Sequence, residues 1–374
     1  MFNLLLLIYC VLNSKEESIS FNITEYAKFR PIITLSFPNE KNNIKFYINT
    51  YLTFSTVKFS YSSMITDRIL NNQTLYLEGQ YKSVLYTTNI KINEHISINN
   101  ISIYNVDSSF NMYYKDLGLA LGYHIKENSF SIVHKLYDNN FIDHLQFAFK
   151  NIKHESDQFY IGGIPNNEHL NLPYKATIKV NETLPTWGFT IDKIIINGKE
   201  YNIGLPAIIS SASDSLFISD DLYNLFKDNI LKEEIEEGLC QLSTADTDKY
   251  IQCIEESLND TYGLVINNIK FEFSTKIFQK SYYGVVESNY EDHKAHNFTG
   301  IILGPHFISQ FNYTLFDYEK KQIEFYSDTS IITTLYTSNT IIKLFLFIEY
   351  ILLLFNLMVL IYSKLFILET IYSY

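Results

Sequence analysis

Two apolar runs in this sequence each end at a small polar side chain that could belong to a binding site. In the segment 45–48, the apolar residues 46–48 lead into Asn49, and residues 207–209 lead into Ser210. Short apolar runs of this kind are typical of buried or half-buried strands. Because both runs end in the same way, we expect Asn49 and Ser210 to face each other at two strand ends. An amide and a hydroxyl can offer neutral hydrogen bonds there.

A possible metal site is much weaker. His293 and His296 have a spacing seen in metal sites, but no further ligands lie nearby in the sequence. We interpret this segment as a polar surface loop and expect neither a metal nor a cofactor.

An ordered set of motifs near the carboxyl end resembles the pepsin-like aspartic endopeptidase family. An apolar-apolar-Gly step at 302–304 is followed by Phe-Asp at 316–317 and a closing strand at 322–325. Such a step lets strands approach where no Cβ fits. Related motifs lie at 116–123, 159–164 and 187–192, so the resemblance runs with gaps from about residue 31 to 325. It implies a mostly β, bilobed pepsin-like fold, with an N-terminal lobe at 25–170 and a C-terminal lobe at 171–328.

The same resemblance indicates that the catalytic motifs are lost. The family has two Asp-Thr/Ser-Gly triplets, and this chain contains none; its first glycine is Gly79. The alignment places Asn49 and Ser210 at the two catalytic positions, or Ser211 if Ser215 is used as the anchor. A looser rival alignment sets residues 59–63 at the first position.

These replacements matter because an aspartic protease needs two adjacent carboxylates that share one proton. Neither an amide nor a hydroxyl accepts that proton near neutral pH. Asp67 and Asp214 could be proposed as substitutes, but neither is followed by Thr/Ser-Gly. We interpret them as solvated loop acids.

The flap hairpin of the family has a partial counterpart at residues 75–83. Here Tyr76 corresponds to the flap tyrosine and Gly79 to the one glycine that remains. Packing of Tyr76 within a strand is an equally good interpretation, because tyrosine is common in strands.

Both ends of the chain are apolar. Residues 1–14 resemble a secretory signal peptide. Residues 344–362 are almost wholly apolar and flanked by Lys343 and Lys364, which predicts a transmembrane helix at 341–363 and a short tail at 364–374. Glu349 and Asn356 would share a face of that helix.

The mature chain keeps two cysteines, Cys240 and Cys253, which in a secreted lobe predict one disulfide. Glycosylation sequons fit the same route; they begin at Asn22, Asn72, Asn100, Asn181, Asn259, Asn297 and Asn312. The net charge of −12, without a basic stripe, opposes nucleic-acid binding.

Two functions remain open. The first is a membrane-anchored, non-catalytic pepsin homologue that binds a peptide or protein between its lobes, at the cell surface or in the secretory pathway. The alternative is a divergent aspartic endopeptidase that carries out proteolysis at a membrane. The sequence does not indicate an oligomeric state.

Overall fold

The computed structural model describes residues 18–361 apart from 24, 28–29, 37–43, 51–54, 59–67, 77–79, 107–117, 125–129, 152–156, 197, 212–215, 219, 246–247, 255–260, 275–282, 289–299, 336–346 and 360. The described residues form three β-sheets and a few short helices, so the prediction of a mostly β protein is confirmed.

The first sheet has eight strands, all from the amino-terminal part of the chain. Their order is β2-β3-β4-β9-β5-β8-β7-β6. The pairing of β4 with β9 is parallel, and it brings together two segments about seventy residues apart in the sequence. The strands are β2 (Glu25–Ala27), β3 (Arg30–Leu35), β4 (Ile44–Asn49), β5 (Ser55–Lys58), β6 (Arg68–Tyr76), β7 (Gln80–Lys91), β8 (Ser97–Val106) and β9 (Gly118–Ala120).

The second sheet has ten strands, all from the carboxyl-terminal part. Their order is β16-β17-β20-β15-β21-β14-β13-β18-β19-β24. The strands are β13 (Gly188–Ile196), β14 (Lys199–Ile209), β15 (Leu216–Ile218), β16 (Cys240–Ala245), β17 (Asp248–Ile254), β18 (Thr261–Ile266), β19 (Ile269–Ser274), β20 (Tyr283–Ser288), β21 (Ile301–Leu303) and β24 (Ile332–Thr334).

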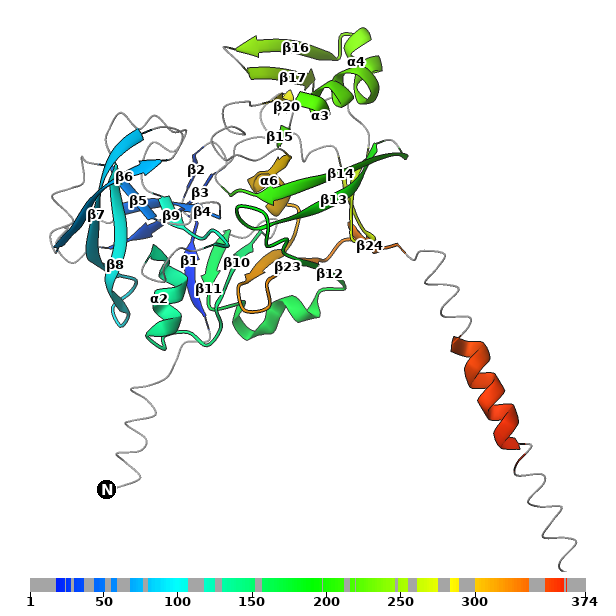
Figure 1. Ribbon diagram of the computed structural model, residues 1–374, viewed down its shortest axis with the longest axis horizontal. Coiled ribbons are helices and arrows are strands. Elements are labelled where there is room, and N and C mark those ends of the chain that lie inside the picture. Colours follow the sequence, from blue (N-terminus) through cyan, green and yellow to red (C-terminus); the bar gives the residue numbers. More distant parts are fainter. Residues whose placement is uncertain are drawn as a thin grey trace, which may run out of the picture.

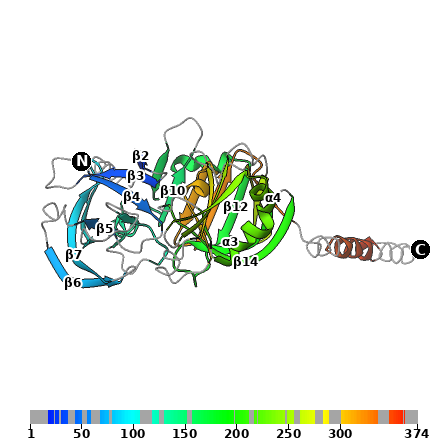
Figure 2. The ribbon, with the colours of Figure 1, turned by 90° about the horizontal axis from the view of Figure 1, so that it is seen from above.

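The third sheet joins the two parts of the chain. Its order is β1-β11-β10-β22-β23-β12, and it lies between the other two sheets (Figures 1 and 2). Its central pair is β10 with β22, in which Phe147 lies opposite Phe316. The strands are β1 (Ile19–Asn22), β10 (Gln146–Lys150), β11 (Gln158–Ile161), β12 (Tyr174–Lys179), β22 (Tyr313–Asp317) and β23 (Gln322–Ser327).

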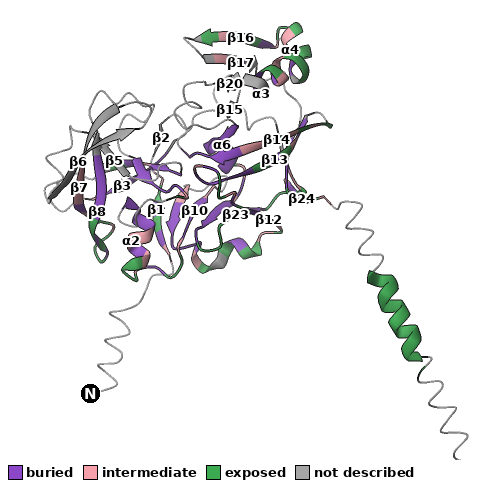
Figure 3. Cartoon of the chain, in the orientation of Figure 1, coloured by how far each residue is buried: buried purple, intermediate pink, exposed green. Residues whose placement is uncertain are grey.

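Side chains alternate between the two faces of the third sheet, and one face packs into the main core. On β23, Ile323 and Phe325 are completely buried in the main core, and Glu324 between them points to the other face. Phe147 stacks on Phe316 with ring centroids 4.6 Å apart, and Trp187 meets Phe316 edge-on at 5.2 Å. Aromatic contacts of this kind add to the free energy gained from burial. The purple interior of Figure 3 shows this core.

The helices are short. In α2 (Ile132–Asp138), the Ser131 side chain caps the start by accepting from the His134 N–H, and Ile132, Val133 and Leu136 are buried. Three short helices follow residue 219: α3 (Asp220–Leu225), the π-helix η4 (Phe226–Ile230) and α4 (Lys232–Glu236). The others are the 3-10 helix η3 (Pro165–Asn171) and α6 (Pro305–Ile308).

The terminal predictions have different outcomes. The signal peptide at 1–14 and the tail at 364–374 lie outside the described residues. Within the predicted span at 341–363, residues 347–359 are helical, and Figure 3 shows them exposed. Across the described residues, no helix is long and apolar enough to cross a membrane, so the predicted transmembrane helix is not supported by the structure.

Candidate functional site

The candidate site lies where β4 and β14 end. On β4, Phe46 and Ile48 are buried, and the strand finishes at Asn49. On β14, the last three residues, 207–209, are completely buried, and Ser210 follows directly. The two apolar runs therefore form the strands that the sequence predicts, and both stop at the expected polar residues.

The residues just after these positions bind each other across the two sheets. The Thr50 N–H donates to Ser211 Oγ at 3.0 Å, and the Ser211 N–H donates to Thr50 Oγ1 at 2.9 Å. Each hydroxyl then donates to a strand carbonyl: Thr50 Oγ1 to Ile209 O at 2.9 Å, and Ser211 Oγ to Ile48 O at 2.6 Å. Each residue thus plays the same role towards the other, as in a two-fold arrangement.

Asn49 and Ser210 themselves are nearly covered, with 1% and 3% of their surfaces exposed. Their main chains are fixed by the neighbouring strands: the Leu121 N–H donates to Asn49 O at 3.0 Å, and the Ser210 N–H donates to Leu303 O at 2.9 Å. The structure therefore brings the backbones that carry the two predicted residues to one place. Neither side chain can be an acid or a base near neutral pH.

Three further side chains hold the backbone next to the site through hydrogen bonds that the sequence did not predict. The Thr186 hydroxyl donates to Thr50 O at 2.7 Å, and the Trp187 indole N–H donates to Leu121 O at 2.7 Å. The buried Tyr318 hydroxyl also donates to Leu121 O, at 3.0 Å. Burial raises the pKa of Tyr318 well above its ordinary value, so this hydroxyl keeps its proton. Threonine and tryptophan far along the chain gave no local signal for this role.

Gly188, the first residue of β13, allows this strand to pack closely against β14. A Cβ at this position would lie 2.5 Å from Ala207 O and 2.7 Å from Leu184 Cδ1, which is closer than real Cβ contacts. The glycine is therefore needed for the close packing of β13 against β14 next to the site.

The predicted flap forms a hairpin, but its tip is outside the described residues. β6 ends at Tyr76, which pairs with Gln80 at the start of β7, and Gly79 lies in the undescribed segment 77–79. β6 is an edge strand, with β7, β8, β5 and β9 between it and β4. The role of Tyr76 at the site stays a prediction.

The structure does not test the other predicted residues. Asp67, Asp214 and residues 59–63 of the rival alignment lie outside the described residues, as do His293 and His296. Among the residues that the structure describes, no group of three or more His, Cys, Asp or Glu side chains could hold a metal ion.

The two cysteines lie opposite each other. In the antiparallel pair β16 and β17, Cys240 is the register partner of Cys253. Facing residues in such a pair have Cα atoms about 4.5–5.5 Å apart, which is within the range that a disulfide spans. The backbone is therefore compatible with the predicted bond.

Comparison with known proteins shows the fold. No family model and no curated protein matches the sequence. The structure is similar to basic 7S globulin from soybean, with a TM-score of 0.61 and 13% identity over 84% of this chain and 95% of that chain. It is equally similar to an aspartic proteinase from Irpex lacteus, with a TM-score of 0.61 and 12% identity over 84% of this chain and 98% of that chain. The chain has the fold of the pepsin-like aspartic proteinases.

Proposed function

We propose that the protein is a non-catalytic member of the pepsin-like fold that binds a peptide or protein segment between its two lobes. The observation that carries the proposal is the identity of the two residues before the Thr50–Ser211 contact. Asn49 and Ser210 occupy equivalent places at the ends of β4 and β14, where the resemblance to pepsin-like enzymes puts the catalytic carboxylates. An amide and a hydroxyl cannot share and transfer the proton that activates water.

The alternative proposal is a divergent aspartic endopeptidase. The fold favours it in part, because one similar structure is an aspartic proteinase, whereas the other is a globulin. Catalysis would then depend on carboxylates such as Asp67 and Asp214. The identity of Asn49 and Ser210 supports the binding proposal instead, because neither an amide nor a hydroxyl can act as the acid or base that peptide hydrolysis needs.

We also propose that the chain enters the secretory route and stays attached to a membrane. The supporting features are the apolar segment at 344–362 and the large apolar side chains at 347–359, which range from 43% to 67% exposed. Exposed apolar surface of this extent marks a contact with a membrane or another protein. Resistance to alkaline carbonate extraction is the expected result, and release of the full chain into the soluble fraction would contradict it.

A disulfide between Cys240 and Cys253 completes this proposal. Disulfides form in oxidising compartments and are rare in the cytosol. The register of β16 and β17 and the burial of Cys240 support it.

The binding function can be tested by retention of peptides on the purified, immobilised full chain. A mixture of peptides is applied, and the bound fraction is eluted and identified by mass spectrometry. We expect a set of peptides to be retained intact and to bind about ten-fold more weakly to a Tyr76→Ala variant, a loss of about 1.4 kcal/mol. The matched control is Tyr201→Ala on the β13–β14 hairpin, which should retain them normally. Absence of any retained peptide would contradict the proposal.

A further inference from the structure

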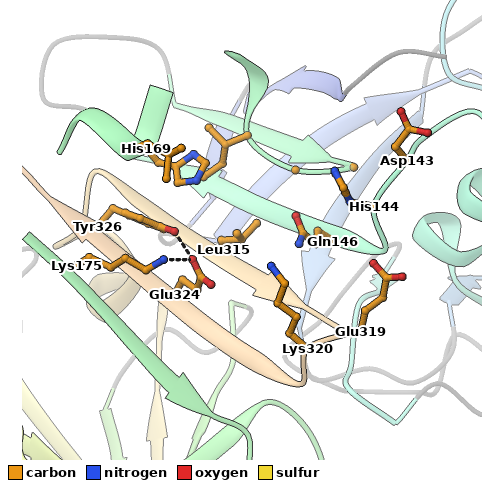
Figure 4. Close-up of a pocket in the computed structure, with 14 residues that line it drawn as sticks. Asp143, His144, Gln146, His169, Lys175, Leu315, Glu319, Lys320, Glu324 and Tyr326 are labelled. Atoms are coloured by element: carbon orange, nitrogen blue, oxygen red, sulfur yellow. Dashed lines mark hydrogen bonds and ion pairs between the residues drawn. The ribbon is translucent and has the colours of Figure 1, made fainter. Parts of the chain in front are cut away.

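The outer face of the six-stranded sheet carries a cavity that is separate from the site between β4 and β14. Its volume is about 460 Å³, within the range of small-molecule sites. It lies over β10, β22, β23 and β12 and is bounded by the Gly162–Gly163 turn and by η3 (Figure 4). The opposite face of the same sheet packs into the main core.

Both hydrogen-bond donors and acceptors line the cavity. Lys175 Nζ donates to Glu324 Oε2 at 2.9 Å, and the Tyr326 hydroxyl donates to the same oxygen. Gln322 Nε2 donates to Glu324 Oε1, which has a second lone pair for a ligand. Gln146 donates through Nε2 to Asp317 Oδ2 at 2.6 Å, which leaves Gln146 Oε1 as an acceptor. The ammonium group of Lys175 has three N–H donors, so it keeps donors for a ligand.

The charged groups of the cavity already have partners, although its carboxylates (Asp143, Glu319 and Glu324) outnumber its lysines. Glu319 accepts from the Tyr137 hydroxyl and from the Leu145 N–H. Lys175 is paired with Glu324, and Lys320 lies 3.5 Å from Asp317 Oδ2. Burial raises the pKa of Glu324, but hydrogen bonds from Lys175 and Tyr326 outweigh this, so the pKa is lowered and the carboxylate is ionised. Burial lowers the pKa of His169, which keeps that ring neutral. A charged ligand would therefore have to compete with an existing partner and lose its hydration.

The entrance is kept open and is partly apolar. Gly163 has φ +120°, and a Cβ there would lie 3.3 Å from Gln146 Oε1, in the space beside that acceptor. Leu170 on η3 is 63% exposed. Among the described residues before 336, no other large apolar side chain is as exposed. The cavity thus combines a polar floor with one apolar edge.

We propose that this cavity binds an uncharged polyhydroxy compound of monosaccharide size. Adjacent hydroxyls both donate and accept, so they match Gln146 Oε1 and Glu324 as acceptors and Lys175 and Lys320 as donors. The carbon face of a sugar ring would lie against Leu170. An anion without hydroxyls could not donate to the two acceptors, and an amine without hydroxyls could not accept from the two lysines. The charged group of a charged sugar would have to compete with the existing pairs.

The test is a calorimetric titration of the purified full chain, kept in a detergent without a sugar head group. The neutral probes are the methyl glycosides of glucose, mannose and galactose, and N-acetylglucosamine. The charged probes are glucuronate, glucosamine and glycine. We expect at least one neutral probe to bind more tightly than every charged probe. Binding of none of the neutral probes, or tighter binding of a charged probe, would overturn the proposal.

A pair of neighbouring lysines gives a matched control. Lys320 and Lys321 lie in the same β22–β23 turn, both are exposed and both are ion-paired, but only Lys320 lines the cavity. Lys320→Met should weaken binding of the neutral probe about ten-fold or more, as expected for a charge-assisted hydrogen bond. Lys321→Met should leave the affinity unchanged. Equal affinities of the two variants would contradict the assignment of the ligand to this cavity.

Discussion

Thr50 and Ser211 lock the ends of β4 and β14 together, each donating its main-chain N–H to the hydroxyl of the other. The hydroxyls continue to Ile209 O and Ile48 O, so four buried hydrogen bonds join residues 159 to 163 positions apart in the chain. This contact fixes the distance between the backbones of Asn49 and Ser210. The frame therefore holds the two candidate positions rigidly relative to each other.

The Thr50–Ser211 contact should be important for stability. Thr50→Val preserves the shape of the side chain but removes its hydroxyl. The Ser211 N–H and Ile209 O then stay buried without the hydrogen bonds that this hydroxyl makes. The free energy of unfolding should fall by about 2–4 kcal/mol, because each buried unsatisfied group costs about 1–3 kcal/mol. Urea denaturation measures this loss. Thr183→Val, which removes an exposed hydroxyl bonded to Asn181, is the control and should change stability by less than about 0.5 kcal/mol.

Stability should fall on acidification. Burial lowers the pKa values of His134 and His169 below 6.5, so the unfolded chain takes up these protons first and stability is lost as the pH falls below that value. The hydrogen bond from the Tyr313 hydroxyl lowers the pKa of Glu168, and the hydrogen bonds from Lys175 and Tyr326 lower the pKa of Glu324. Both glutamates therefore add to the loss of stability as the pH falls below 4.5.

The histidine contribution can be isolated by mutation. The half-buried His134 ring meets Tyr318 edge-on, so His134→Phe keeps the packing and removes the proton uptake. Melting temperatures measured between neutral and mildly acidic pH should depend less on pH in this variant than in the exposed His95→Phe control. An equal pH dependence in the two variants would show that His134 does not contribute.

Replacing either cysteine should destabilise the chain. Cys240→Ser removes the proposed disulfide that closes the β16–β17 hairpin, and closure of a loop of this size contributes about 3 kcal/mol. Peptide mapping without reduction should show the two cysteines in one cross-linked fragment. Free thiols at both positions, detected by alkylation of the unreduced chain, would contradict the bond.

Restoring carboxylates should not restore an enzyme. In Asn49→Asp/Ser210→Asp, Tyr51 and Ala212 still stand where the resemblance places glycines, which give the loops their backbone freedom. Two buried, adjacent carboxylates raise each other's pKa, so this variant should be less stable at neutral pH and recover as the pH falls. Stability measured against pH tests this sign. A variant as stable at neutral pH as the original chain would show that the two positions do not interact.

Local signals predicted much of the fold. Asn197-Gly198 between apolar runs predicts a hairpin turn, and Ile196 indeed pairs with Lys199. The run at 269–273 predicts a strand, which forms as β19. The ends of β4 and β14 could be found because both show the same apolar approach.

Contacts between distant residues could not be predicted in this way. The bonds from Thr186 to Thr50 and from Trp187 to Leu121 join segments 136 and 66 positions apart, and no local pattern indicates them. The polar cavity was missed for a similar reason. Its residues come from four strands, from η3 and from the turns beside them, and alternation along each strand shows only which side chains share a face.

The most direct test of the account is hydrolysis of an internally quenched peptide mixture by the purified full chain from about pH 2 to about pH 7, the range in which carboxylates and histidines titrate. We predict no cleavage above the blank at any pH, and no effect of a transition-state mimic that inhibits pepsin-like enzymes. An acid-optimal activity that is blocked by the mimic and lost in Asp214→Asn would contradict the account and establish a protease.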